Sequence, residues 1–407
     1  MMYKLNDDLL KKYAQVMVHY ALNNGKGINK GDTVYLVAQE CAKDLFMAIA
    51  KEIYAAGGNL ITQYLPDNIR QTSLTRFLLQ NGSDEQVSFF AAPYWQGIVD
   101  AADHILFIIA EPDIHVFEGL SSSKISMMNS ARAPWFQMRE KKEQEAKLSW
   151  SLCLYGTQSM ADEAGLTLDE YWEQIIEACY LRENDPVAKW NQVQAEIEKI
   201  KNKLDALQIE KLHIKGNDID LEIRLGKHRK WLSGGGKNIP SFEIFTSPDW
   251  RGTNGHITFN QPLYYSGQRI AGVHLQFKDG VVITSSATEN EDALKEMIAQ
   301  ENADKVGEYS LTDKRHSRIT KFMATTLFDE NTGGEFGNTH IALGNAYKDT
   351  FTGDMSKVSE KEWKDMGYNS CPKVHTDIVS TTNRIVTATL ADNSEKIIYE
   401  DGMFVID

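Results

Sequence analysis

Short apolar runs alternate with helical stretches in the first 156 residues, and this alternation constrains the fold more than any other feature. The strand-like runs are residues 32–39, 60–65, 104–113 and 150–156. An amphipathic stretch, residues 41–58, ends in two glycines, and a second helical stretch lies around residues 83–102. Apolar strands separated by helices predict a doubly wound parallel sheet, and therefore an α/β fold for this part of the chain.

The pattern changes near residue 210. Residues 211–226 read as a hairpin that turns at Asn217-Asp218, and residues 272–283 as a hairpin that turns at Asp279-Gly280. The second half is therefore predicted to be mainly antiparallel sheet with some helices, so that the whole chain combines an α/β part with an α+β part.

Two helices are predicted between these halves. Thr167 and Glu170 form a capping box before an apolar stretch, and Asp185-Pro186 opens a long polar helix. We expect an N-terminal α/β domain over 1–190, a helical linker over 191–209 and a C-terminal domain over 210–407. A chain of 407 residues suits two domains of this size.

The composition indicates which binding partners to exclude and which cellular compartment to expect. The net charge of −14 disfavours nucleic acid or an anionic membrane as a partner. The four cysteines form no CxxC pair, which favours a reducing compartment. The N-terminus resembles no cleaved leader, and no apolar run reaches the length of a membrane span. We therefore expect a cytoplasmic protein.

Several common catalytic motifs are missing from the sequence. The chain has no GxGxxG, GxSxG or HExxH pattern. GLSSSK, residues 119–124, is predicted to be a polar loop. SGGGK, residues 233–237, lacks the spacing of a phosphate-binding loop and is interpreted as a flexible loop.

Acidic and imidazole side chains gather in the second half. His375 and Asp377 lie two apart in a strand-like run, so both side chains would project from one face. The other candidates are Glu243, Glu308, Asp329, Glu330, Glu335, His340 and Tyr347. Carboxylates in apolar surroundings are costly unless they are paired or bind a cation. Each residue alone also fits an ion pair, a buried histidine or a packing role, and spacing does not assemble them into one site.

Several segments together resemble one known family. NIPSFEIFTSP (238–248), LFDEN (327–331) with NTHIALGNAY (338–347), and HTDIV (375–379) resemble signature blocks of the thermophilic-type metallo-aminopeptidases, the group of aminopeptidases T, S and PepS. Residues 10–38, 154–172 and 184–190 resemble other parts of that family in the same order. The resemblance runs along nearly the whole chain.

This resemblance implies a set of metal ligands and a catalytic residue. The implied ligands are Glu243, Glu308, Glu330, His340, His375 and Asp377, and the implied catalytic residue is Tyr347. Two departures stand out. The spacer TGGEFGNT (332–339) is longer than in some members, so that Glu335 could replace Glu330 as a ligand. Phe242 stands where many members carry a polar residue.

The resemblance further implies a hydrolase that removes N-terminal residues from short peptides with a free amine. Two divalent ions, zinc first and cobalt or manganese as substitutes, would lower the pKa of a water molecule that attacks the first peptide carbonyl. Glu243 or Glu308 would carry the proton, and Tyr347 would donate to the oxyanion. A homodimer is also implied.

The alternative function is that of a mononuclear iron dioxygenase acting on dihydroxypyridines, because the resemblance implies that the same scaffold also carries this activity. That chemistry needs two histidines and one carboxylate, which His340, His375 and Asp377 could supply. The presence of both Glu243 and Glu308 favours a second ion and therefore hydrolysis.

Overall fold

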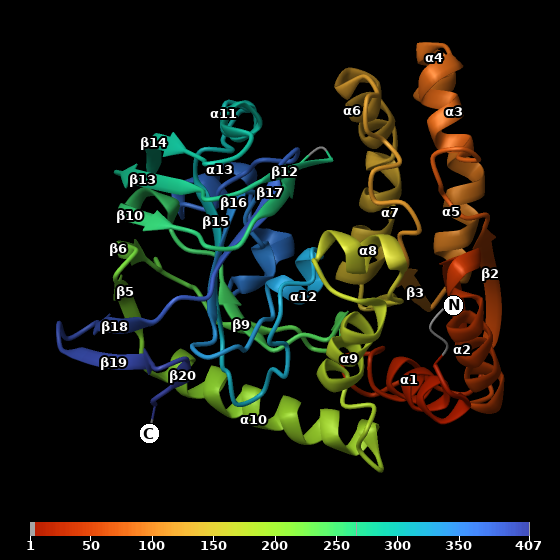
Figure 1. Cartoon of the computed structure of the whole chain (residues 1–407). Coiled ribbons are helices and arrows are strands. Elements are labelled where there is room, and N and C mark those ends of the chain that lie inside the picture. Colours follow the sequence, from red (N-terminus) through yellow and green to blue (C-terminus); the bar gives the residue numbers. More distant parts are fainter. Residues whose placement is uncertain (1–4, 266, 407) are drawn as a thin grey trace. The chain divides into compact units, whose positions relative to one another are not determined.

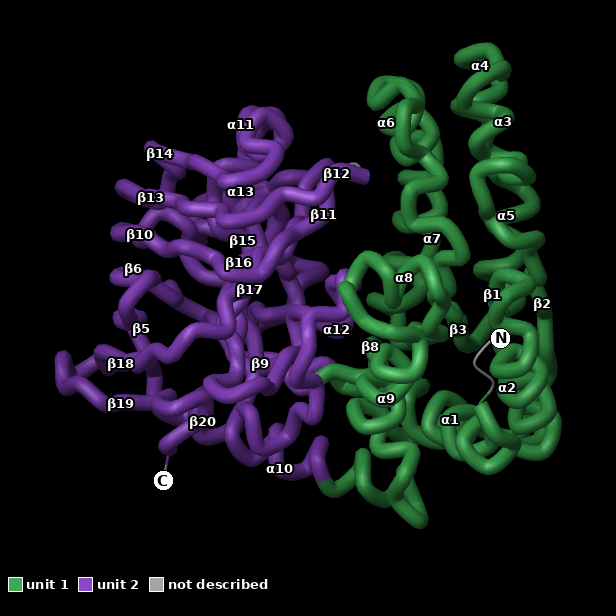
Figure 2. The backbone as a smooth tube through the Cα atoms, in the orientation of Figure 1, with its two compact units in different colours: residues 1–192, 235–241 green, residues 193–234, 242–407 purple. Residues whose placement is uncertain are grey.

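The computed structural model describes residues 5–265 and 267–406, and the chain divides into two compact units. Unit 1 contains residues 1–192 and 235–241, and unit 2 contains residues 193–234 and 242–407 (Figure 2). The chain first passes from unit 1 to unit 2 within the long helix α10, Pro186–Ala206. The predicted domain division at 190–210 stays a prediction.

Unit 1 is built on a parallel sheet with the strand order β2-β1-β3-β4-β8. Figure 1 labels its strands β2 and β3. Its strands are β1 Thr33–Gln39, β2 Asn59–Leu65, β3 His104–Ile109, β4 Ser149–Leu154 and β8 Asn238–Ile239. The α/β prediction is confirmed for this unit. The third strand ends at Ile109, earlier than predicted. The short strand β8 comes from much later in the chain.

Helices connect these strands. The helices up to α10 are α1 Asp7–His19, η1 Glu40–Ala42, α2 Lys43–Ala55, α3 Leu74–Asn81, α4 Asp84–Val87, α5 Ala92–Ala101, α6 Ser122–Ala131, α7 Ala133–Gln144, α8 Gln158–Glu163 and α9 Leu168–Ala178. The predicted capping box of Thr167 and Glu170 is present at the start of α9. The loop prediction for 119–124 is wrong in its second half, because the Ser121 side chain caps α6, which begins at Ser122.

Unit 2 is built from antiparallel sheets, as predicted. An eight-stranded sheet has the order β14-β13-β10-β6-β5-β18-β19-β20, a five-stranded sheet β17-β16-β15-β9-β7, and β11 pairs with β12. The strands are β5 Ile209–Gly216, β6 Ile219–Arg224, β7 Leu232–Ser233, β9 Glu243–Thr246, β10 Asn254–Thr258, β11 Leu263–Tyr265, β12 Gln268–Ile270, β13 His274–Lys278, β14 Val281–Ser286, β15 Val306–Thr312, β16 Asn338–Gly344, β17 His375–Ser380, β18 Arg384–Leu390, β19 Glu395–Glu400 and β20 Met403–Phe404.

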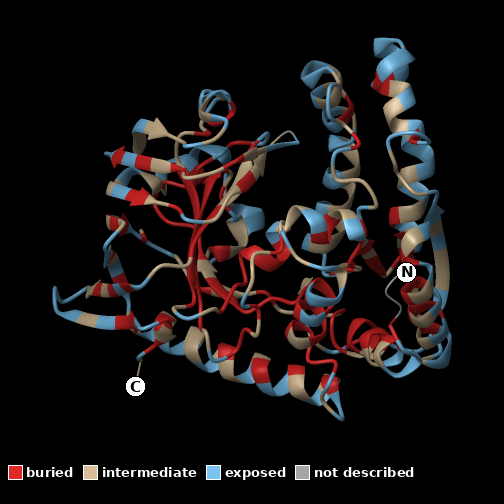
Figure 3. Cartoon of the chain, in the orientation of Figure 1, coloured by how far each residue is buried: buried red, intermediate tan, exposed pale blue. Residues whose placement is uncertain are grey.

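The core of unit 2 follows the five-stranded sheet. Every residue of β15 and β16 is buried (Figure 3). Both predicted hairpins are present, as β5–β6 and β13–β14, and Asp279 and Gly280 both have positive φ, as a tight hairpin turn requires. The predicted loop at 233–237 joins β7 to β8.

Few helices accompany these sheets. They are η2 Trp250–Gly252, α11 Glu291–Ile298, α12 Thr326–Asp329, η3 Lys348–Thr350, η4 Met355–Lys357 and α13 Glu360–Asp365. None of the helices in the described residues combines the length and the apolar character needed to cross a membrane.

The buried carboxylate of Asp249 and its two arginine partners carry a prediction about stability. The Asp249 carboxylate accepts hydrogen bonds from Arg224 Nη2 at 2.6 Å and from Arg251 Nε at 2.8 Å. Burial alone would raise the pKa of Asp249, but the two guanidinium groups lower it below its ordinary value. Because both arginines are about half-exposed, we expect Asp249→Ala to cost about 1 to 3 kcal/mol of unfolding free energy, measured by urea unfolding at pH 7.

The same measurement at several pH values tests the sign of this contribution. A lowered folded-state pKa gives a stabilisation that is present above the unfolded pKa of about 4 and is lost as the pH falls through the folded pKa. The difference in stability between the wild type and Asp249→Ala should therefore shrink in acid. A difference that stays constant from pH 7 to pH 3 would contradict this electrostatic explanation.

Candidate metal centre

One face of the five-stranded sheet collects the candidate ligands. Alternate residues of a strand share a face, and residues paired across neighbouring strands share it too. Glu243 pairs with Thr312 of β15, and His340 pairs with Ser310 of the same strand. Asp377 pairs with Ala342, which in turn pairs with Glu308. The strand period and the register therefore bring the ligand candidates of β9, β15, β16 and β17 to one surface.

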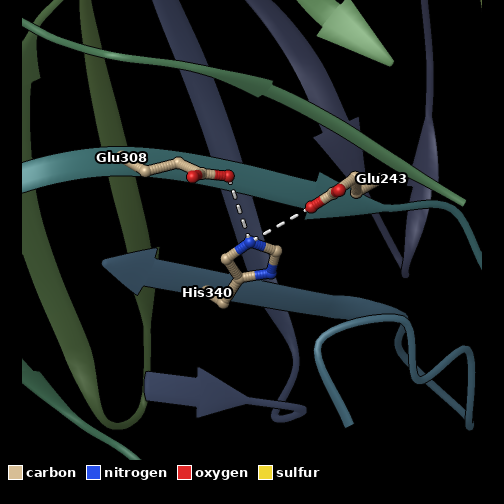
Figure 4. A group of neighbouring side chains, drawn as sticks. All are labelled: Glu243, Glu308 and His340. Carbon is tan, nitrogen blue, oxygen red and sulfur yellow. Dashed lines mark hydrogen bonds and ion pairs between the residues drawn. The ribbon is translucent and has the colours of Figure 1, made fainter. Parts of the chain in front are cut away.

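The side chains form two groups of potential metal-donor atoms, called donor groups below. The first is centred on His340. His340 Nε2 lies 3.3 Å from Glu243 Oε2 and 3.4 Å from Glu308 Oε1. Figure 4 shows the three side chains reaching toward one another, with the second ring nitrogen of His340 pointing away from both carboxylates. One donor atom from each side chain fits within a span of 4.8 Å, and all three residues are buried.

The second group of donors shares Glu308 with the first. His375 Nε2 lies 3.4 Å from Glu308 Oε2 and 3.7 Å from Asp377 Oδ1, and these donors also fit within 4.8 Å. His375 Nδ1 donates to the Asn345 carbonyl at 2.8 Å when that nitrogen carries the proton, which leaves Nε2 as the coordinating atom. Glu308 thus offers one oxygen to each group.

Glu330 and Glu335 occupy different environments. Glu330 follows α12 and is only 8% exposed, and the pKa of its carboxyl is raised well above the ordinary value by burial and by the charges of Glu243 and Asp377. Glu335 is exposed, and its backbone carbonyl accepts a hydrogen bond from Lys314 Nζ. Neither residue is part of the two compact donor groups among the described residues, but only Glu330 is buried beside them.

Tyr347 lies at the rim of the donor groups. Its ring centroid is 4.6 Å from that of His375 and 5.7 Å from that of Phe245, and the residue is 42% exposed. Partial burial and the charges of Glu308 and Asp377 raise the pKa of its hydroxyl well above the ordinary value. The hydroxyl therefore keeps its proton at neutral pH and can donate a hydrogen bond.

Interactions between carboxylates and imidazoles outweigh the effect of burial on the pKa values of Glu308 and His375. Burial opposes ionisation of Glu308, but hydrogen bonds from His340 and His375 lower its pKa to about 2. Burial likewise disfavours the charged form of His375, yet Glu308 and Asp377 raise its pKa to about 9. Protonated imidazoles thus compensate the buried carboxylates here, and a divalent cation would do the same between neutral imidazoles.

The donor set fits divalent metal ions. Imidazole nitrogens mixed with carboxylate oxygens are typical of zinc and related transition metals. Asp377 Oδ1 is buried and accepts no hydrogen bond within the described residues, although buried polar atoms normally have a partner. A cation would satisfy this oxygen.

Sequence reasoning named Asp329 only as a candidate ligand, and it missed that Asp329 and Asn338 hold the backbone around Glu330. The Asp329 carboxylate accepts hydrogen bonds from the backbone N–H groups of Met323 at 2.7 Å and Thr325 at 2.9 Å, which fixes the segment before Glu330. Asn338 Nδ2 donates to the Glu330 carbonyl at 3.0 Å. These residues lie in the same short blocks as the ligand candidates, and that proximity was the available signal.

Comparison with known proteins decides the family. The sequence model of the thermophilic metalloprotease (M29) family matches residues 6–404. The chain belongs to this family. The resemblance seen in the sequence and the predicted enzyme class, a metallo-aminopeptidase, are both confirmed at the level of the M29 family.

Individual members are similar over their full length. Aminopeptidase PepS of Streptococcus thermophilus is 28% identical over 425 residues, covering 98% of each chain. Aminopeptidase AmpS of Bacillus subtilis (strain 168) is 25% identical, covering 97% of each chain. The structure of wild-type AmpT from Thermus thermophilus has a TM-score of 0.84 at 23% identity, covering 98% of this chain and 99% of that one, and therefore shares the fold.

Proposed function

We propose that this M29 member is a dinuclear aminopeptidase that removes N-terminal residues from short peptides. The observation that carries the proposal is Glu308, whose two carboxylate oxygens face two different donor groups. A carboxylate placed between two sets of donors is suited to bridge two ions. The proposed ligands are Glu243, Glu308, Glu330, His340, His375 and Asp377.

The site residues would act at three points of the reaction. Divalent ions held there, zinc first and cobalt or manganese as substitutes, would polarise the peptide carbonyl and lower the pKa of a water molecule. Glu243 would take a proton from the attacking water and deliver it to the leaving amine, because both oxygens of Glu308 face donor groups. The Tyr347 hydroxyl would donate a hydrogen bond to the carbonyl oxygen as negative charge develops on it.

The acidic surroundings also support a preference for free N-termini. A substrate α-ammonium group is attracted to a carboxylate-rich site, and an acetylated N-terminus loses that attraction. All four cysteines are free thiols, which supports a reducing compartment such as the cytoplasm. We further propose a homodimer, as the family resemblance implies.

Chelation tests the proposed chemistry. We expect hydrolysis of leucine p-nitroanilide to fall by about 100-fold or more after dialysis against a chelator, because the ions supply several kcal/mol of transition-state stabilisation. Zinc, cobalt or manganese should restore the activity. N-acetyl-leucine p-nitroanilide is the matched control substrate and should not be cleaved. Cleavage of both substrates at similar rates, or activity indifferent to chelation, would contradict the proposal.

The dioxygenase alternative is tested by the same preparation. A facial site of His340, His375 and Asp377 needs neither Glu243 nor a bridging role for Glu308. The close approach of both glutamates to His340 therefore favours the hydrolase. Oxygen consumption with a dihydroxypyridine, dependent on iron, would favour the dioxygenase instead.

A further inference from the structure

Asn331 connects two segments that carry candidate ligands. The residue is 0% exposed and directly follows Glu330. Its side-chain oxygen Oδ1 accepts a hydrogen bond from the backbone N–H of Phe242 at 2.6 Å, immediately before Glu243. Its Nδ2 donates to the Leu327 carbonyl at 3.0 Å and to Glu330 Oε1 at 3.3 Å. One buried amide therefore contacts the start of β9, helix α12 and a carboxylate of the site.

The orientation of this amide is fixed by its partners. Oδ1 faces an N–H donor, whereas Nδ2 faces two acceptors. A flipped amide would place its oxygen against the Leu327 carbonyl and the Glu330 carboxylate, and would turn an N–H group toward that of Phe242. All three hydrogen bonds would then be lost in a buried place, which is costly. Only one of the two amide orientations suits the site.

The contact with Glu330 occupies one of its two carboxylate oxygens. Asn331 Nδ2 donates to Glu330 Oε1, and both residues are buried. A neutral amide N–H can hold a carboxylate oxygen without bringing a positive charge that would compete with a metal ion. The backbone of Glu330 is held separately, by Asn338 Nδ2 and by Thr312 Oγ1 at 3.4 Å.

We infer that Asn331 is a positioning residue for the metal centre. It holds one oxygen of Glu330 so that the second oxygen can serve a cation, and it fixes the backbone next to Glu243. One buried side chain thus links the carboxylate of Glu330 to the backbone next to Glu243. The inference rests on the proposed function, because it takes Glu330 as a ligand. Residues that orient metal ligands commonly change metal affinity by 10- to 100-fold when they are removed.

Two substitutions separate the contributions of this amide. Asn331→Ala removes all three hydrogen bonds. Asn331→Asp keeps the shape and an acceptor for the Phe242 N–H, but it places an oxygen against Glu330 Oε1. Asn338→Ala is the matched control, because it loosens the same segment through the Glu330 carbonyl without touching the carboxylate. The full-length proteins are stripped of metal and titrated with zinc against a chromophoric chelator, and the thermal unfolding of the stripped proteins reports folding.

We expect both Asn331 variants to bind at least one zinc ion about 10- to 100-fold more weakly than the wild type. Asn338→Ala should lower the melting temperature but change zinc affinity by less than about threefold, as expected for a contact that does not reach a ligand atom. Wild-type affinity in Asn331→Asp would overturn the inference, and so would an equal loss in Asn338→Ala. If Asn331→Ala does not fold, Asn331→Asp decides. A wild type that binds no zinc and hydrolyses nothing would instead overturn the proposed function.

Discussion

Replacing Glu308 with alanine is expected to reduce kcat/KM for leucine p-nitroanilide by about a thousandfold or more. The side chain offers one oxygen to each donor group, so its removal weakens both at once. Several kcal/mol of transition-state stabilisation depend on the ions, and each 1.36 kcal/mol corresponds to a tenfold rate change. The bound metal, measured by mass spectrometry, should fall from about two ions per chain to one or fewer.

Glu335→Ala is the matched control for this experiment. Glu335 is the rival ligand from the same acidic stretch, and the structure places it at the exposed surface. Its removal should leave metal content and kcat/KM within about twofold of the wild type, as for most exposed positions. Metal loss in Glu335→Ala, or full activity in Glu308→Ala, would contradict the proposed ligand set.

Replacing Tyr347 with phenylalanine is expected to lower kcat by roughly 100- to 1000-fold, the usual effect of removing one hydrogen-bond donor to an oxyanion. Phenylalanine keeps the ring that contacts His375 and Phe245. Metal content and KM should therefore stay close to the wild-type values. Stopped assays with the metal-loaded protein measure kcat and KM separately.

Tyr64→Phe is the control for loss of a tyrosine hydroxyl. Tyr64 is 40% exposed, close to the exposure of Tyr347, but belongs to unit 1 and donates to the Glu40 carbonyl. Its substitution should not change kcat. If Tyr347→Phe loses metal together with activity, the hydroxyl acts on the metal centre and not on the reacting carbonyl.

Much of the fold could be predicted from local patterns in the sequence. Strand-like runs located β1, β2 and β4, the Asp279-Gly280 pair located a hairpin, and Thr167 with Glu170 located the start of α9. Helices α6 and α7 were missed because α6 is only weakly amphipathic and α7 has no fully buried residue, so that neither shows a clear apolar stripe. The pairing of β8 with β4 joins segments about 85 residues apart and leaves no local signal.

Local patterns in the sequence predicted less of the candidate site than of the fold. The period of a strand placed His375 beside Asp377, and β17 bears this out as a strand. Nothing local relates that pair to Glu308 or His340, because their proximity depends on the register of β15, β16 and β17. The resemblance to a family supplied that connection. Glu330 was preferred to Glu335 as a ligand because its Asp-Glu-Asn block matches the family. The structure adds that Glu330 is buried and Glu335 exposed, a difference that a glycine-rich spacer does not reveal.

The number of metal ions per chain, measured in the same sample as the peptidase activity, tests the dinuclear site most directly. The purified protein is analysed by mass spectrometry, stripped by chelation and reloaded with zinc, cobalt or manganese in steps. Two ions per chain are predicted, with release of leucine from peptides that appears as the ions are restored. One iron per chain with no hydrolysis of any aminoacyl substrate, or full hydrolysis by the metal-free protein, would contradict the dinuclear aminopeptidase.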